Sequence, residues 1–283
     1  MMLYRHMGVA VSFSPRLEAL IAEVAHLAPS MADRLSLIHA GPRTPENVAR
    51  LQRACDAAGM SIQAETLWVS GSPDTAILEA VESSGMDLLL AGALEKEKPL
   101  RYYLGSVAHN LVRDAPCSLI LLTDPQIEPR PIRTIIVVAE YTDGALTALR
   151  KAIRLAEAEG AEQIFVIRVL SQYGAEMLMT QGVRRERALA YDTAGRAQEE
   201  GMLHDFVDAA GQSQVPIHAQ CVEGETGYIA SQFSRKKNAD LLVMPSSHQH
   251  GHFFERLFPS DMEWVLREIP CDLWVVRDRV GRG

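Results

Sequence analysis

The stretch Met86-Asp-Leu-Leu-Leu-Ala-Gly92 occurs again, 153 residues later, as Ala239-Asp-Leu-Leu-Val-Met-Pro245. Gly71 and Gly224 are separated by the same offset, while Ala115–Leu122 and Ile269–Val276 share the pattern x-Pro-Cys-x-Leu at an offset of 154. Near the starts, Met7–Val11 matches Ile135–Ala139 at an offset of 128. Because these anchors recur in the same order, the chain contains one unit used twice, and the second copy carries about 25 extra residues after its second strand.

Each unit contains short apolar runs that alternate with stretches of helical periodicity. Such runs indicate buried strands, and their alternation with helices indicates right-handed crossovers in a parallel sheet covered on both faces. The predicted fold is therefore α/β, with two doubly wound five-stranded parallel-sheet domains in tandem. The predicted strands are His6–Val11, Leu35–Ala40, Ile62–Val69, Asp87–Ala91 and Ser118–Leu122, then Arg133–Ala139, Gln163–Val169, Pro216–Val222, Asp240–Met244 and Asp272–Val276.

The repeat also sets the expected domain limits, 1–124 and 131–283, with the proline-containing segment Asp124–Arg130 as the linker. The extra residues of the second unit lie near 172–200 and are rich in Arg, Glu, Ala and Met. We expect one long or additional helix there, with Met177, Leu178 and Met179 available to pack on the other unit. The last strands, around Leu119–Leu122 and Leu273–Val276, are the expected site of pairing between the units.

The composition excludes several classes of function. The 36 acidic residues outnumber the 28 Lys and Arg, and the net charge of -8 is spread without blocks. The nearest basic run, Arg184 to Arg187, is interrupted by Glu186, so no nucleic-acid partner is expected. No apolar stretch reaches the ~18 residues of a membrane span, and no signal peptide is visible at the start. The four cysteines form no CxxC pair, and we expect reduced thiols in a cytoplasmic protein.

Ligands of doubly wound sheets bind beyond the carboxyl ends of the strands, where the strand order reverses. In the first unit Gly92 ends the fourth strand, and Gly105 and Ser106 open the last helix. Backbone N–H groups and a hydroxyl there are suited to phosphate, although Gly-Ser before a helix is also an ordinary N-cap. The candidate cofactor-binding residues are Gly92, Gly105, Ser106, Ser12, Ala40 and Val107.

The chain resembles the universal stress protein family along nearly its whole length, twice. The resemblance rests on Gly92 followed by Gly105-Ser106, on Leu104-Gly-Ser-Val-Ala108, on Ala115-Pro-Cys117 and on Asn238-Ala-Asp-Leu-Leu-Val-Met244. It implies the adenine nucleotide alpha hydrolase-like fold and a role in stress adaptation. In the ATP-binding branch of that family, two glycines and Gly-Ser/Thr hold the phosphates, and an Asp ending the first strand holds the ribose or a metal.

The first unit keeps that pattern only in part. Glu95 stands in place of the second glycine and Ser12 in place of the Asp, and a carboxylate at Glu95 opposes a triphosphate. Lys96 and Lys98 would offset that charge if they turned inward. ATP is accordingly the candidate cofactor of the first unit only.

The second unit departs further from the family. Pro245, His248 and Pro259 replace the three glycines, while Ser260 remains and Glu140 keeps an acidic group at the first strand. Proline offers no N–H to a phosphate. The run His248-Gln-His-Gly-His252 could bind a divalent metal through neutral imidazoles. We favour a polar loop filling an abandoned site, because alternate residues usually point apart, and we assign no metal site.

The sequence contains no nucleophile elbow, complete P-loop or His-Glu-x-x-His motif, so we expect a binding or signalling protein and no enzyme. Two alternatives stay open. One is slow ATP hydrolysis resting on Gly92, Gly105 and Ser106, and the other is a nucleotide-independent scaffold that docks a protein partner near Met177. The expected partners are an adenine nucleotide, a protein, and the other unit of the same chain, with a homodimer of whole chains left open and no membrane partner.

Overall fold

A computed structural model of the chain describes residues 2–60, 62–93, 105–170, 185–246, 259–267 and 269–277. The first unit runs β1 (Tyr4–Ala10), α1 (Leu17–Met31), β2 (Ala32–Ala40), α2 (Pro45–Ala57), β3 (Ala64–Val69), α3 (Pro73–Ser83), β4 (Leu88–Gly92), α4 (Ser106–Asp114) and β5 (Ser118–Leu122). The second runs β6 (Thr134–Val138), α5 (Asp143–Glu159), β7 (Gln163–Leu170), α7 (Arg185–Ala210), β8 (Ile217–Glu223), α8 (Thr226–Lys237), β9 (Leu241–Ser246), α9 (Pro259–Arg267) and β10 (Asp272–Arg277).

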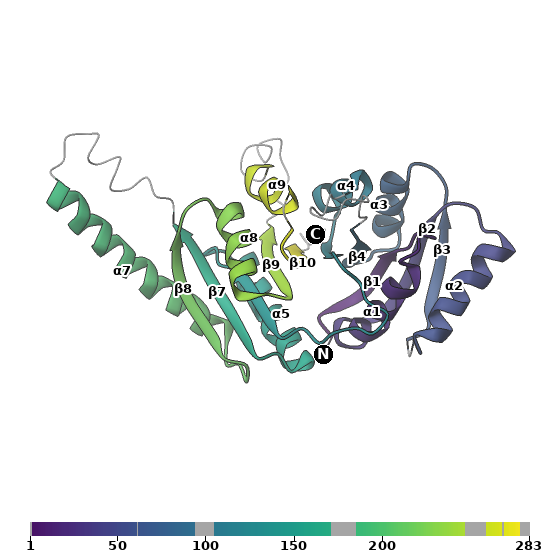
Figure 1. Ribbon diagram of the computed structural model, residues 1–283, viewed down its shortest axis with the longest axis horizontal. Coiled ribbons are helices and arrows are strands. Elements are labelled where there is room, and N and C mark those ends of the chain that lie inside the picture. Colours follow the sequence, from purple (N-terminus) through teal and green to yellow (C-terminus); the bar gives the residue numbers. More distant parts are fainter. Residues whose placement is uncertain are drawn as a thin grey trace.

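The described strands form one ten-stranded sheet in the order β3-β2-β1-β4-β5-β10-β9-β6-β7-β8. Neighbouring strands are parallel within each half, and β5 and β10 meet antiparallel at the centre. Each half has the doubly wound order with its reversal beside the first strand. The predicted fold class is therefore confirmed, with the addition that both halves share a single sheet (Figure 1). The domain limits 1–124 and 131–283 stay predictions.

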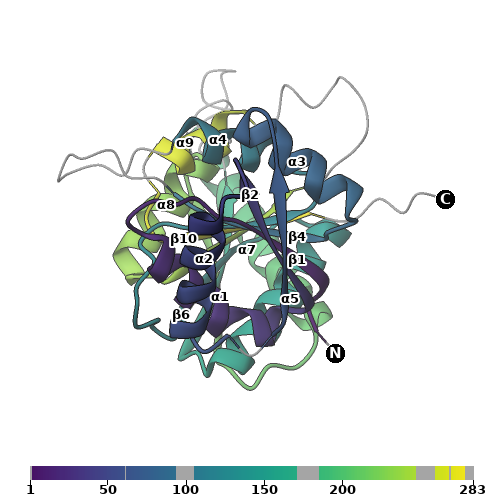
Figure 2. The same ribbon diagram turned by 90° about the vertical axis from the view of Figure 1, so that its right-hand side faces the viewer.

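The strands are apolar on both faces because helices cover both faces. Along β4, Leu88 and Leu90 belong to one buried cluster while Leu89 and Ala91 belong to the other. Side chains of α1, α2, α5 and α7 join the first cluster, and those of α3, α4, α8 and α9 join the second. Both clusters include strand residues from the two halves, so each core continues across the molecule. Figure 2 shows α3 and α4 on the opposite side of the first-unit strands from α1 and α2.

The repeat anchors have the same structural role in both halves. The carboxylate of Asp87 accepts the backbone N–H of His6 at 2.8 Å, and that of Asp240 accepts the N–H of Thr134 at 2.8 Å. In return, the N–H of Asp87 donates to the carbonyl of His6, and the N–H of Asp240 donates to that of Thr134. These two aspartates tie the start of the fourth strand to the first strand of each unit, which explains their matched positions in the sequence.

The seam between the halves is held by β5 and β10. Ile120 lies opposite Trp274 at its centre, and the buried indole Nε1–H of Trp274 donates to the hydroxyl of Tyr4 at 3.1 Å. On the face covered by α1 and α5, His26 and Glu159 approach to 2.8 Å. The expected pairing of the units through their last strands is therefore confirmed.

Two predicted elements differ in extent. The helical spacing of the apolar residues from Leu17 to Leu27 predicts a first helix that ends at Leu27, but α1 continues to Met31 through Pro29. The last turn buries Ala28 and Met31 almost completely, and this burial offsets the hydrogen bond that a proline cannot donate. In the second unit, α7 begins at Arg185 and runs to Ala210, so part of the extra segment lengthens the helix after the second strand. Residues Met177 to Met179 lie outside the described residues.

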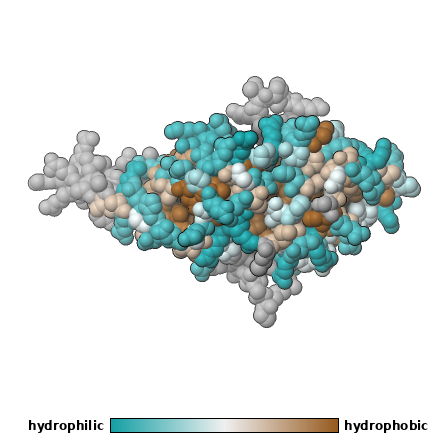
Figure 3. Space-filling view, turned by 90° about the horizontal axis from the view of Figure 1, so that it is seen from below, coloured by the Kyte–Doolittle hydropathy of each residue, from teal (hydrophilic) through white to brown (hydrophobic). Residues whose placement is uncertain are grey.

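The surface agrees with the charge balance. The face in Figure 3 is hydrophilic over most of its described area, with small separate hydrophobic patches. Among the described helices, none is long and apolar enough to span a membrane.

Candidate functional site

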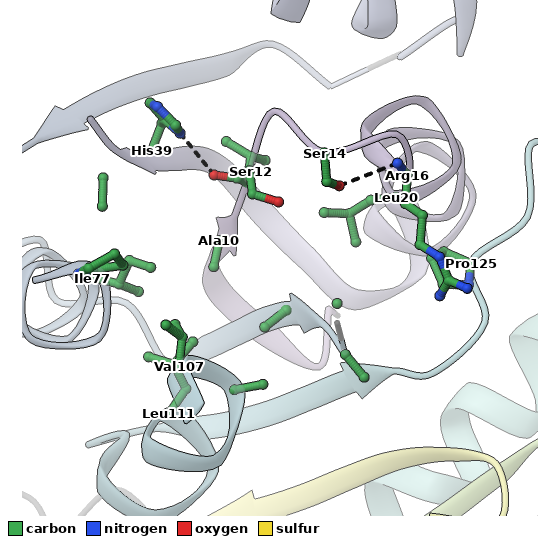
Figure 4. Close-up of a pocket in the computed structure, with 17 residues that line it drawn as sticks. Ala10, Ser12, Ser14, Arg16, Leu20, His39, Ile77, Val107, Leu111 and Pro125 are labelled. Carbon is green, nitrogen blue, oxygen red and sulfur yellow. Dashed lines mark hydrogen bonds between the residues drawn. The ribbon is translucent and has the colours of Figure 1, made fainter. Parts of the chain in front are cut away.

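A cavity of about 220 Å³ lies at the carboxyl ends of β1, β2 and β4 in the first unit. Its walls are mostly apolar. Ser12, Ser14 and Arg16 follow β1, and Ile77, Val107 and Leu111 of α3 and α4 lie on the opposite side (Figure 4). This is the place where the strand order reverses, as expected for a ligand cleft in this fold.

The structure brings four of the six predicted site residues together around the cavity: Ser12, Ala40, Gly92 and Val107. Gly105 and Ser106 are not part of the wall. Gly105 is the N-cap of α4 and Ser106 its first residue, directly before Val107. The start of α4 therefore adjoins the cavity, and its first N–H groups have no partner within the helix.

Gly92 leaves room in the cavity. A Cβ at this position would lie 3.7 Å from Cδ1 of Leu20, an ordinary contact distance. The glycine is therefore not required by crowding of the protein itself, and a larger side chain would extend into the cavity. Gly92, which the sequence pattern identified, thus leaves the cavity open because it has no side chain.

The loop after β1 is fixed by neighbours that sequence reasoning missed. His39 donates from Nδ1 to the carbonyl of Val11 at 3.0 Å, and Arg50 donates to the carbonyls of Phe13 and Ser14 at 3.1 and 2.9 Å. His39 is the residue before the last of β2 and also lines the cavity. Its position near the carboxyl end of an apolar strand, at the same sheet end as Ser12, was the signal available in the sequence.

A polar contact joins α3 to α4 beside the site. Asn110 donates from its amide to Asp74 at 2.6 Å, and the Ser72 hydroxyl also donates to Asp74. The hydrogen bonds from Ser72 and Asn110 lower the pKa of the half-buried Asp74 to about 2. Asp74 is therefore ionised at ordinary pH, and it holds α4 against α3 on the cavity's far wall.

The second unit has different side chains at the equivalent place. Arg168 corresponds to His39, and its guanidinium lies 4.7 Å from the ring centre of Tyr141 and 3.4 Å from the carboxylate of Glu199. Tyr141 donates to the same carboxylate at 3.0 Å, and its burial together with this bond raises the Tyr141 pKa. These three side chains bond one another between β6, β7 and α7.

The other second-unit candidates are placed as follows. Pro245 occupies in β9 the position of Gly92 in β4, since the two pair with Val276 and Leu122 respectively. Glu140 follows β6 as Ser12 follows β1, and Pro259 and Ser260 begin α9. The loops with Glu95, Lys96 and Lys98 and with His248, His250 and His252 lie outside the described residues. Among the residues that are described, no group of three or more His, Cys, Asp or Glu could hold a metal ion.

A doubly wound α/β unit is present twice in one sheet, and the first copy has a cavity at its switch point; this arrangement defines a tandem α/β protein. The sequence model of the universal stress protein family matches residues 40–123 and 131–277. The chain belongs to this family, with two such domains in tandem.

Solved structures show the same full-length arrangement. A universal stress protein from Archaeoglobus fulgidus is 16% identical, with a TM-score of 0.69, and the match covers 97% of this chain and 98% of the other. A putative universal stress protein from Pseudomonas aeruginosa UCBPP-PA14 is 17% identical (TM-score 0.68, coverage 98% and 94%). A functionally unknown protein from Pseudomonas aeruginosa PAO1 is 18% identical (TM-score 0.64, coverage 98% and 93%). A comparison with curated proteins found no match.

Proposed function

We propose that the first unit binds one adenine nucleotide per chain, without catalysis, as part of a binding or signalling role in stress adaptation. The observation that carries this proposal is the apolar cavity at the first-unit switch point, which adjoins the start of α4. Members of the universal stress protein family bind adenine nucleotides, and one has been solved in complex with cAMP.

The size and polarity of the cavity support a nucleoside. Its volume of about 220 Å³ is below the ~300–1,000 Å³ of pockets for drug-sized ligands. A base and ribose are of suitable size, and the phosphates then extend toward the N–H groups of Gly105, Ser106 and Val107. The positive end of the helix dipole favours an anion there.

The lining also supports binding rather than hydrolysis. Among its described residues, the ionisable side chains are Arg16 and His39, and none is a carboxylate. Ser12 stands where the ATP-binding branch has an acidic residue, so no described wall residue is suited to hold Mg²⁺. Among the described residues of the second unit, Pro245 has no N–H to offer an anion and the carboxylate of Glu199 already contacts Arg168 and Tyr141, which supports one ligand per chain.

Isothermal titration with ATP, ADP and cAMP tests this proposal, with Gly92→Leu as the test variant and Pro245→Leu as its matched control. We expect the wild type to bind one nucleotide per chain, Gly92→Leu to weaken binding at least about tenfold by filling the cavity, and Pro245→Leu to retain it. Absence of binding by the wild type, or equal loss in both variants, would overturn the proposal.

A turnover assay decides between binding and slow ATP hydrolysis. Phosphate release from ATP that Gly105→Trp abolishes would replace the binding proposal with an ATPase. A nucleotide-free chain that still captures a protein partner would instead favour the scaffold role.

A further inference from the structure

The last strand of the second unit reaches α4 of the first unit through Arg277. The buried guanidinium donates to four backbone carbonyls: from Nη1 to Ala115 at 2.6 Å and Cys117 at 3.3 Å, and from Nη2 to Val112 and to Arg113 at 3.3 Å. Val112 and Arg113 lie in the last turn of α4, where carbonyls lack partners within the helix and a cation is favoured by the helix dipole. Burial lowers the pKa of Arg277 to about 10, so it remains charged near neutral pH.

The other end of the same strand holds the linker. Oδ1 of Asp272 accepts the backbone N–H of Thr123 at 2.7 Å and its hydroxyl at 2.9 Å. The carbonyl of Thr123 in turn accepts from Nη1 of Arg16 at 3.3 Å. Two residues farther on, Pro125 lines the first-unit cavity, as does Arg16 (Figure 4).

Arg277 and Asp272 therefore support two walls of one cavity. Val107, Ala108 and Leu111 form the wall contributed by α4, and Pro125 forms part of the wall contributed by the linker. The first unit's own cation in the last turn of α4, Arg113, pairs with Asp114 at 2.8 Å, whereas the guanidinium that bonds the carbonyls there and the carboxylate that holds Thr123 belong to the second unit. Within the described residues, both come from the two ends of β10.

The second unit supports the first through these charged contacts, and the first unit does not return them. By the repeat offset of 154, Thr123 corresponds to Arg277, and Ser118 corresponds to Asp272. Ser118 does repeat one contact, since its hydroxyl accepts the N–H of Arg277 at 3.0 Å. Thr123, however, carries no charge that it could place at the end of α9.

We propose that Arg277 and Asp272 are positioning residues for the first-unit site and that the second unit holds this site in its binding shape. The identity of the ligand in this inference rests on the proposed function. The effect of Arg277 and Asp272 on the cavity walls is independent of the proposed function, because it can be measured without any ligand.

The test uses full-length chains and two readouts. Hydrogen–deuterium exchange of residues 105–114 and 123–126 is measured without ligand, and ATP affinity is measured by titration. The variants are Arg277→Met, Arg277→Lys and Asp272→Ser. The control is Glu159→Gln, which alters the contact with His26 between the units at 2.8 Å and touches no wall of the cavity.

We expect Arg277→Met to speed exchange in α4 by about tenfold or more, since charge-assisted bonds to its carbonyls are lost. ATP affinity should fall by about fivefold or more while near-ultraviolet circular dichroism shows the chain still folded. Arg277→Lys should recover part of both losses. Asp272→Ser should act on residues 123–126, and Glu159→Gln should change neither readout.

Unchanged exchange and affinity in Arg277→Met, or equal effects in Glu159→Gln, would overturn the inference. If Arg277→Met does not fold, Arg277→Lys and Asp272→Ser decide by the same two readouts. If the wild type binds no ATP, the proposed function fails, and the exchange measurements alone then support or refute the positioning role.

Discussion

The carboxylate of Asp272 gives a quantitative prediction of how stability depends on pH. Asp272 begins β10 at the seam, and burial, opposed by the two bonds from Thr123, raises its pKa from 3.8 to about 6. The nearby charges of Glu23 and Asp124 contribute to the rise. The folded state thus binds this proton more tightly than the unfolded state. Ionisation of Asp272 therefore destabilises the folded state relative to the unfolded state. This destabilisation is absent below about pH 4 and fully present above about pH 6.

The size of the effect follows from the pKa values. A rise of about two pKa units, at about 1.36 kcal/mol each, corresponds to at most about 3 kcal/mol. Asp272→Asn keeps an oxygen for both Thr123 bonds and removes the ionisation. We therefore expect the stability of Asp272→Asn, relative to wild type, to increase by about 1–3 kcal/mol between pH 4 and pH 7.

Urea unfolding at several pH values, followed by circular dichroism, measures this difference. Glu128→Gln, the same chemical change at an exposed site in the linker, serves as the control and should give a nearly constant difference. A difference for Asp272→Asn that stays flat with pH, or that falls as pH rises, would refute the assignment of the penalty to this buried carboxylate.

Three further predictions concern the core, the thiols and the surface. Tyr4→Phe leaves the buried Nε1–H of Trp274 without its acceptor at 3.1 Å, so the free energy of unfolding in urea should fall by about 1–3 kcal/mol; an unchanged midpoint would contradict this. In a native thiol titration with a chromogenic disulfide, the half-buried Cys55 should react before the buried Cys271, whose pKa is raised by burial, and all four thiols should react in denaturant. Glu162→Gln removes an exposed ion pair of 2.6 Å and should change stability by less than about 1 kcal/mol in a thermal melt.

The repeat made most of the fold predictable. Matched offsets located Asp87 and Asp240, whose carboxylates hold the first strands in both halves, and they placed the last strands that pair at the seam. The passage of α1 through Pro29 was not predictable from local preference, because it depends on burial of Met31 in a core built from distant strands.

The sequence predicted the part of the candidate site that lies at strand ends and at the start of a helix, because the residue types expected at such positions are known. Gly92, Ser12, Ala40 and Val107 line the cavity because strand ends and a helix start meet at the switch point. Arg16 and Pro125 could not be placed there from the sequence. Arg16 lies at the cavity because it precedes α1, and Pro125 lies there because of the path of the linker. That path depends on the bond between Thr123 and Asp272, which are 149 residues apart in the sequence.

Because the two units are fused in one chain, the charged residues of β10 can pair with a strand, β5, that carries no complementary charges. If two second units paired in the register of β5 and β10, Asp272 of each copy would lie within one residue of the oppositely charged Arg277 of the other. In the single chain these residues instead meet Thr123 and Ser118 of the first unit. A short tether keeps the first unit at an effective concentration of about millimolar beside the second. The covalent link between the units, more than matching of charges, thus determines that β10 pairs with β5. A cut within 124–130 would allow the second half to associate with copies of itself.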